Sequence, residues 1–320
     1  MQNSLVVQNS VAVNSMQELA NRFSEYIDVS ALSMKSYNSG VRKFLNFLHD
    51  EGIVQPTRDT VLLYKKTLTE KYSANTVALY LSALRRFFSW TESEGLYPNI
   101  TNGLKSPKIS HEHKRDAFSA DELNGIIAGM KHNTLEAKRN YAIFTLIASC
   151  GLRTIEVSRA NVVDMHRVAG VWILDIQGKG RTSKDAFVKL ADPVKEAIDE
   201  YLSARGHVSP NAPLFASCSR RNKGRRITAQ TVSQVCKRAM IHAGYNSKRL
   251  TAHSLRHSAI TIALMMGQSL DDVSAFARHS SISVTMIYNH SISRMKSLCE
   301  NAIAGAIFRG GEIRCYQQRL

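Results

Sequence analysis

The sequence is poor in cysteine and proline and contains no long apolar run. Its 320 residues include five cysteines and six prolines. The cysteines are scattered, odd in number and without a CxxC pair, which disfavours a disulfide framework and fits a reduced cytosolic setting. No segment reaches the ~18 uninterrupted apolar residues of a membrane-spanning helix. The first fifteen residues lack the basic segment and apolar core of a secretory signal. These absences predict a soluble, cytoplasmic protein that does not span a membrane.

Acidic residues are also scarce. The chain has 26 Asp and Glu against 42 Lys and Arg, which gives a formal net charge of +16 and a pI near 9.8. The excess is uneven, with +3 on residues 1–110 and +13 on residues 111–320. Such a charge indicates a polyanionic partner, either nucleic acid or an anionic membrane face. The length favours two domains, and the second carries most of the positive field.

Residues 15–104 predict a helical bundle. Apolar side chains recur at helical spacing around 19–27, 37–48, 62–68 and 77–90, and Ser73 has the chemistry of an N-cap for the last helix. Residues 1–14 are polar and expected to be flexible. Four basic residues lie on the second and fourth helices: Arg42, Lys43, Arg85 and Arg86. They fit either a solvated helix face or the side of the bundle that faces a DNA backbone.

A second domain is expected over residues 119–290. Residues 105–118 have broken periodicity and clustered charge, as in a linker, and Ser119 and Glu122 have the spacing of a capping box. Strands are predicted at 162–168, 171–176 and 186–190, and helices at about 194–205, 228–243, 253–266 and 270–277. The predicted fold is mainly α with a small antiparallel β-sheet in the C-terminal domain.

The stretch 251–290 places chemically active residues at suggestive spacing. His253 and Arg256 lie within one helical turn, followed by His279 and Tyr288. Arginine never ligates metals and tyrosine seldom does, so a metal site is disfavoured; a zinc site from His253 and His257 lacks the intervening Glu and a third ligand. Arginine matches phosphate oxygens, histidine moves protons near neutral pH, and tyrosine is a competent nucleophile. The set therefore indicates attack on a phosphate.

Four motifs give this stretch a family context. GLRTIEV, QGKGRTSK, AHSLRHSAIT and ARHSSISVTMIYNH occur in this order. Together they resemble the signatures of the tyrosine recombinases, the phage-integrase and Xer-type family, and the N-terminal bundle resembles that family's core-binding domain. The likeness covers roughly residues 15–308. It implies a two-domain clamp around duplex DNA, with the active site in the basic C-terminal domain.

The resemblance also implies the roles of individual residues. Arg153 and Arg256 would clamp the non-bridging oxygens of the scissile phosphate, and Lys179 would protonate the leaving 5′ oxygen. Tyr288 would attack and form a 3′-phosphotyrosine. Two arginines and a lysine suit the charge that develops in phosphoryl transfer, and conserving bond energy in the phosphotyrosine requires neither ATP nor a metal, so no cofactor is expected.

Three further residues complete the implied site. His253 would serve as acid/base, His279 would donate a hydrogen bond to the phosphate, and Glu156 would support the site. Alternatives remain for several of these residues. Arg153 and Glu156 fit an i, i+3 surface pair, Lys184 competes with Lys179, His257 fits a structural role, and Tyr288 alone fits a core aromatic.

Other basic residues are candidates for DNA contact. One group lies in the run 219–226, which fits a disordered solubilising loop or phosphate contact: Arg220, Arg221, Lys223, Arg225 and Arg226. Arg278 stands where the family usually has glycine, in Ala-Arg-His instead of Leu-Gly-His. A bulky cation at a tight helix end raises a question about local geometry, and contact with DNA is the predicted role.

The expected function is site-specific DNA recombination through a Holliday junction within a homotetramer. Residues 291–320 would form a tail helix that docks into a neighbouring protomer. The alternatives are a DNA-binding regulator on the same fold without catalysis and a type IB topoisomerase-like enzyme. Double-stranded DNA is the expected partner, an accessory directionality factor is an open possibility, and a nucleoid-associated bacterial or phage protein is expected.

Overall fold

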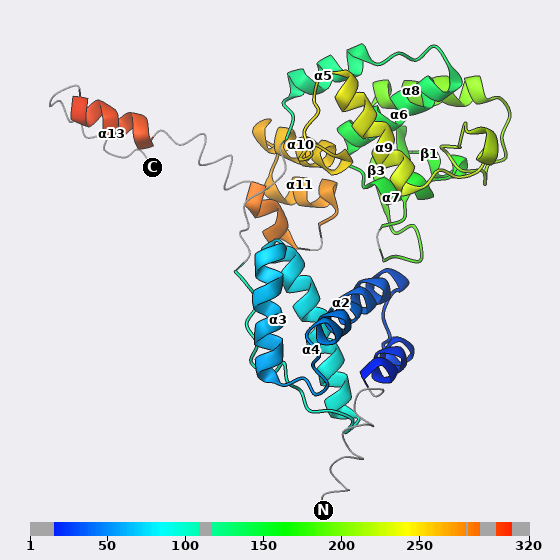
Figure 1. The fold of residues 1–320 in the computed structure, drawn as a ribbon. Helices are drawn as coiled ribbons and strands as arrows, with labels where there is room; N and C mark the ends of the chain where they lie inside the picture. Colours follow the sequence, from blue (N-terminus) through cyan, green and yellow to red (C-terminus); the bar gives the residue numbers. More distant parts are fainter. Residues whose placement is uncertain (1–15, 109–116, 179, 280, 289–298, 309–320) are drawn as a thin grey trace, which may run out of the picture. The chain divides into compact units, whose positions relative to one another are not determined.

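The computed structural model describes residues 16–108, 117–178, 180–279, 281–288 and 299–308. The chain divides into two compact units, Met1–His111 and Glu112–Leu320. Figure 1 shows helices in both units and strands in the second. The predicted flexible segment 1–14 and residues 109–116 of the predicted linker lie outside the described residues. No helix within the described ranges is long and apolar enough to cross a membrane.

The first unit is a bundle of helices. Its helices comprise residues 16–26, α2 (Ala31–Asp50), α3 (Arg58–Lys71) and α4 (Ala74–Ser93). The hydroxyls of Ser30 and Ser73 accept hydrogen bonds from the first turns of α2 and α4, which satisfies otherwise unpaired N–H groups. The N-cap predicted at Ser73 is thus confirmed, as is the helical bundle.

Aromatic rings form much of the core of this unit. Phe44 and Phe88 meet edge to face with their ring centroids 5.9 Å apart, and Phe23 and Phe87 do so at 5.4 Å. At the crossing of α2 and α4, a Cβ added to Gly40 would lie 2.5 Å from the Cβ of Ala83. The close approach of the two helices therefore requires glycine at this position.

The second unit combines helices with one small sheet. The helices are α5 (Ala120–Gly129), α6 (Leu135–Cys150), α7 (Thr154–Arg159), α8 (Asp192–Arg205), α9 (Ala229–His242), α10 (Ala252–Met265), α11 (Leu270–Ala277) and α13 (Cys299–Phe308), with residues 282–288 also helical. Strands β1 (Met165–Val168), β2 (Val171–Ile176) and β3 (Ala186–Lys189) form an antiparallel sheet in the order β1-β2-β3. This confirms the predicted fold class, and the capping box at Ser119 and Glu122 is confirmed as well.

One predicted strand boundary was wrong. The strand expected from Val162 begins at Met165, because Val162–Asp164 form a 3-10 helix. The Asp164 carboxylate accepts the Asn161 N–H at 2.6 Å, and Val162 N–H donates to the carbonyl of Ala212 at 3.0 Å. These bonds tie the first apolar residues to the 210–213 segment, so that the ladder between β1 and β2 begins only at Met165.

Helix α6 is the centre of the second unit. Its residues from Ala142 to Ala148 are buried on every side, and α8, α9 and α10 all pack against it. A helix that is apolar all round belongs in an interior. Because three helices pack against α6, its C-terminal end is fixed. The loop that carries Arg153 starts from this end.

Candidate active site

The site begins where α6 ends. Gly151 has φ 58° and ψ 31°, the left-handed conformation that terminates helices, and a Cβ there would lie 3.1 Å from the Phe276 ring. Arg153 then serves as the N-cap residue of α7. Its N–H donates to Glu156 Oε2 at 2.8 Å, and its Nη1 donates to Oε1 at 2.9 Å. One carboxylate thus fixes both the backbone and the side chain of Arg153.

Glu156 is enclosed by protein. It is 1% exposed and forms ion pairs with two guanidinium groups, Arg153 at 2.9 Å and Arg278 at 3.1 Å. A buried carboxylate needs such partners, because loss of its hydration is otherwise uncompensated. The alternative of an i, i+3 surface pair is therefore wrong in one respect: the pair exists, but its carboxylate is buried.

Helix α10 brings the second arginine to the same loop. Arg256 is 2% exposed, its Nη1 donates to the Gly151 carbonyl at 2.5 Å, and its Nη2 donates to the Ala277 carbonyl. Burial, followed by the charges of Arg153 and Arg278, lowers the pKa of Arg256 to about 10. The group remains a cation at neutral pH. His253 lies one turn earlier on α10 and is exposed.

His279 follows Arg278, the C-cap residue of α11. Its Nδ1 is 2.8 Å from the hydroxyl of Thr285, in a hydrogen bond that links it to helix 282–288. Burial is the largest cause that lowers the pKa of His279 to about 4, and the charges of Arg256, Arg153 and Arg278 add to it. His279 is therefore neutral at pH 7. In this form one ring nitrogen donates a hydrogen bond and the other accepts one.

Tyr288 lies beside the histidines. Its ring centroid is 4.6 Å from that of His257, in an edge-to-face contact, and 6.3 Å from that of His279. It is 7% exposed and belongs to a small apolar cluster of α10 and α11: Ile260, Leu264, Val273 and Ala277. The core-aromatic interpretation of Tyr288 thus describes its packing, while its contact with His279 places it beside another candidate residue.

The candidate lysines differ in their surroundings. Lys179 lies outside the described residues. Beside it, the carbonyl of Gly178 accepts a hydrogen bond from Arg159 Nη1 at 2.9 Å, which ties this turn to α7. Lys184 forms an ion pair with Asp164, whose side chain is buried. This pairing disfavours Lys184 as the competing general acid.

The predicted DNA-contact residues fall into two groups. Four have a partner within the fold: Lys43 with Tyr72, Arg85 with Leu104, Arg226 with Ser158 and Ala160, and Arg278 with Glu156. The others are exposed, as Lys43 and Arg226 also are: Arg42, Arg86, Arg220, Arg221, Lys223 and Arg225. The run 219–226 is an ordered turn, because Ser217 N–H donates to the Arg225 carbonyl at 2.7 Å and Gly224 N–H donates to Ser217 at 2.9 Å.

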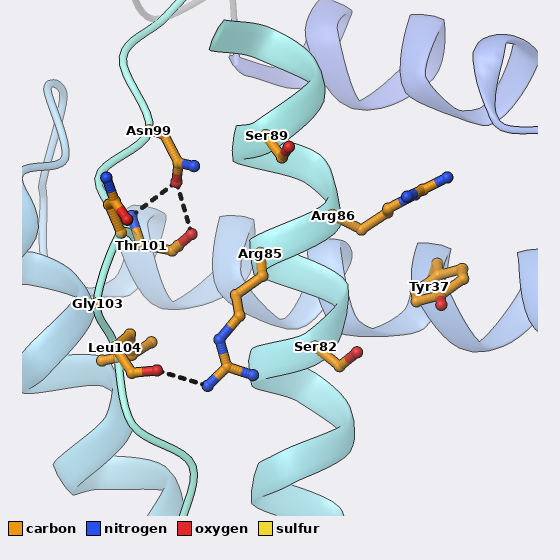
Figure 2. A pocket seen from close by; sticks show the side chains of 10 residues that line it. Tyr37, Ser82, Arg85, Arg86, Ser89, Asn99, Thr101, Gly103 and Leu104 are labelled. Carbon is orange, nitrogen blue, oxygen red and sulfur yellow. Dashed lines mark hydrogen bonds between the residues drawn. The ribbon is translucent and has the colours of Figure 1, made fainter. Parts of the chain in front are cut away.

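Figure 2 shows two adjacent arginines of α4 in different settings. Arg85 donates to the Leu104 carbonyl at 2.7 Å and to the Ser106 hydroxyl at 3.0 Å. Arg86 points away from Leu104, toward the side of Tyr37. The residues around them line a pocket of about 390 Å³. Adjacent positions in the sequence thus have different surroundings, which helical periodicity alone does not distinguish.

Sequence reasoning missed two contributors to the geometry. Thr285 bonds His279, and the carbonyl of Gly151 accepts from both Arg256 and Arg278. No pattern signals the Thr285 contact, since it depends on the path of the chain after α11. The sequence did contain a signal for Gly151, because this residue lies two positions before Arg153.

Comparisons with known proteins now bear on this geometry. The model of the phage integrase family matches residues 117–294, and that of the phage integrase N-terminal SAM-like domain matches residues 20–95. The chain belongs to the phage integrase family. It is 30% identical over 286 residues to the tyrosine recombinase XerD of Proteus mirabilis, covering 87% of this chain and 86% of the relative. Tyrosine recombinase XerC of Thermodesulfovibrio yellowstonii is 27% identical over 273 residues, covering 82% and 86%.

Solved structures share the fold of this recombinase. XerH bound to a palindromic difH substrate in a post-cleavage complex matches with a TM-score of 0.70 and 20% identity, covering 95% of this chain and 89% of that one. A lambda integrase (75–356) dimer bound to a COC′ core site matches with a TM-score of 0.64 and 16% identity, covering 83% and 95%. The family and its named relatives identify the chain as a tyrosine-type recombinase.

The low pKa of His279 predicts a pH effect on stability. The unfolded side chain takes up a proton near pH 6.5, whereas the folded one does so near pH 4. Between these values the unfolded state binds more protons, so the free energy of unfolding falls as the pH falls from 6.5 to 4. We expect His279→Asn to show a smaller loss of stability than the wild type between pH 7.5 and 5.0, measured by urea unfolding.

A matched control is the exposed His207. His207→Gln is expected to leave the difference between the two pH values as in the wild type. An equal difference in wild type and His279→Asn would contradict the depressed pKa.

Proposed function

We propose that this recombinase cleaves and rejoins duplex DNA at specific sites through a 3′-phosphotyrosine on Tyr288. The observation that carries the proposal is the convergence of Arg153, Arg256, His279 and Tyr288, which come from four separate segments of the second unit. Two guanidinium groups beside a phenol form a site for a phosphate and its attacking group. The same region carries most of the positive charge of the chain.

The proposed reaction is a transfer of a phosphoryl group between two oxygens. The phenolic oxygen of Tyr288 forms a bond to phosphorus as the bond from phosphorus to the 5′ oxygen breaks. His253 accepts the phenolic proton, and Lys179 donates a proton to the 5′ oxygen. Arg153 and Arg256 bind the non-bridging oxygens, where negative charge develops. Rejoining follows the same steps in reverse, so the reaction consumes no other reagent.

His279 contributes a hydrogen bond to the phosphate in this proposal. Its pKa of about 4 keeps the ring neutral, and its Nδ1 is engaged with Thr285. The other ring nitrogen is then the atom available to the phosphate. A neutral donor orients an oxygen without adding charge to a site where three arginines already gather.

The first experiment tests the nucleophile. The purified protein is mixed with nicked DNA fragments from its source genome, without metal or ATP, and is then denatured. We expect a protein band shifted by covalently attached DNA, which Tyr288→Phe loses completely because the phenylalanine ring has no attacking oxygen. Sequencing the attached strand gives the target site.

The control is Tyr245→Phe, which removes a tyrosine hydroxyl from the same unit and is expected to retain the adduct. Tight, salt-sensitive DNA binding without any adduct would favour a regulator without catalysis. Relaxation of supercoiled DNA without pairing of two sites would favour a topoisomerase-like enzyme.

We propose that the first unit, over residues 15–104, is the core-binding domain and that residues 119–290 form the catalytic domain, joined by a linker at 105–118. DNA contacts in the first unit would come from the exposed Arg42 and Arg86. In the second, the turn 219–226 would present Arg220, Arg221, Lys223 and Arg225 to phosphates. Side chains with protein partners, such as Arg85, contribute less to this contact because their donors are already used.

The adjacent arginines of α4 give a matched test of this assignment. Removing one phosphate contact lowers the salt dependence of DNA binding by about one unit of slope. We expect Arg86→Gln to show this decrease on duplex DNA of arbitrary sequence. Arg85→Gln is expected to change the slope less and to lower the free energy of unfolding by about 1 kcal/mol, because it loses internal hydrogen bonds. The reverse pattern would contradict the assignment.

Assembly is the remaining part of the proposal. Strand exchange would proceed through a Holliday junction in a tetramer, with residues 291–320 docking into a neighbouring protomer. The described part of this tail, α13, exposes Ile303, Ile307 and Phe308, which is costly for a helix without an apolar partner. Residues 291–298 of the predicted tail lie outside the described residues.

Deleting residues 294–320 tests the tail. We expect the shortened protein to bind a single recombination site with the affinity of the full chain but to lose the complex that pairs two sites, measured by native gel electrophoresis on the site identified by trapping. A shortened protein that still assembles tetramers on DNA would contradict the docking role.

A further inference from the structure

The turn between α11 and His279 has an unusual backbone. Arg278 has φ 52° and ψ 47°, and within the described ranges Ala169 is the other non-glycine residue with positive φ. Glycine adopts this conformation freely, whereas a Cβ makes it unfavourable. A side chain retained at such a position needs a compensating interaction.

The contacts of Arg278 supply that interaction. Its Nη1 donates to the Phe276 carbonyl at 2.7 Å, and its Nη2 donates to the Gly151 carbonyl at 3.2 Å and to Glu156 Oε2 at 3.1 Å. The side chain is 13% exposed. One guanidinium therefore joins the end of α11, the turn after α6 and the buried carboxylate of α7.

We infer that Arg278 is a positioning residue for phosphate binding by Arg153, acting through Glu156, and not a DNA ligand. The inference rests on the proposed function. Glu156 lies between two cations: Oε1 receives Arg153 Nη1, and Oε2 receives Arg278 Nη2 together with the Arg153 backbone N–H. Because Arg278 holds Oε2, the carboxylate of Glu156 has a fixed orientation. Its other oxygen, Oε1, then holds the side chain of Arg153.

The same residue couples the two phosphate-binding arginines. The Gly151 carbonyl accepts Nη2 of Arg278 and Nη1 of Arg256, while Arg256 Nη2 donates to Ala277, the residue before Arg278. Loss of the Arg278 guanidinium would therefore release the carboxylate behind Arg153 and one side of the turn that Arg256 contacts. A shift of even about 1 Å in such groups lowers the rate of a positioned reaction by as much as about 100-fold.

The variant Arg278→Gly distinguishes two cases: a side chain that positions the site, and a side chain that the turn accommodates but does not need. Glycine relieves the backbone strain, so a residue without a further role would be replaced without loss. Ala169→Gly is the matched control, since it relieves the same strain at the β1–β2 turn, and Arg278→Lys keeps the charge but not the planar fork of donors.

Two measurements on the full chain are needed. The first is the affinity of the free protein for orthovanadate, a phosphate probe, by calorimetry. The second is the single-turnover rate of covalent adduct formation at saturating DNA, with the DNA dissociation constant measured separately. We expect Arg278→Gly to weaken vanadate binding at least fivefold and to slow adduct formation at least tenfold, with DNA affinity within twofold. Arg278→Lys should fall between, and Ala169→Gly should match the wild type.

A double-mutant cycle tests the route through Glu156. In a Glu156→Gln background, Arg278→Gly is expected to add little further loss, because the carboxylate that links the two arginines is already gone. Fully multiplicative losses would contradict this route.

Several outcomes would overturn the inference. Wild-type values for Arg278→Gly in both measurements would reduce Arg278 to a turn residue, and weaker DNA binding with an unchanged rate would make it a DNA ligand. Should the glycine variant not fold, a lysine variant equal to the wild type overturns the inference equally. If the wild type forms no adduct but its vanadate binding still depends on Arg278, only the proposed function is refuted. If the wild type does not bind vanadate, the positioning role is refuted.

Discussion

The carboxylate of Glu156 is enclosed by protein, and its burial determines how the arginines of the site are arranged. A charged group without water must be surrounded by hydrogen-bond donors, and here the donors are Arg153, its backbone N–H, and Arg278. The site is therefore organised from within, with the acid at the centre and the cations around it. An arginine held on one side by a buried acid retains other donors for a substrate oxygen.

The balance of charge in this region has a chemical consequence. The site gathers three guanidinium groups, of Arg153, Arg256 and Arg278, and one carboxylate, which pairs with two of them, so a positive excess remains. Burial is the largest cause, and this positive excess the next, of the lowered pKa of His279, about 4, and of Arg256, about 10. In the proposed reaction, a phosphate diester would bring a negative charge that offsets this positive excess.

Much of this architecture could be predicted from the sequence, for reasons tied to local chemistry. The helices were predictable because caps such as Ser73 and the Ser119–Glu122 box act within one turn. The start of β1 was not, because the bonds that divert Val162 come from residue Ala212, about fifty positions away. The family and its fold could be predicted because each motif consists of residues that are close together in the sequence. Both predictions were confirmed.

The candidate site divides in the same way. Residue types and their order were visible in the sequence, but the burial of Glu156 was not, since an i, i+3 spacing looks alike on a surface and in a core. The partner of Arg278 was equally hidden: a cation in a basic chain suggests DNA, and its carboxylate lies 122 residues earlier. The catalytic and DNA-contact assignments therefore remain predictions that rest on geometry and resemblance.

The bonds that define the site also join distant parts of the chain. Arg256 meets Gly151 across 105 residues, and Arg278 meets Glu156 across 122. Contacts of such separation form only after the intervening loops have closed, late in folding. A partly folded chain would hold Tyr288 without the assembled arginines of the site. In the proposed reaction, strand breakage would then be restricted to the native state.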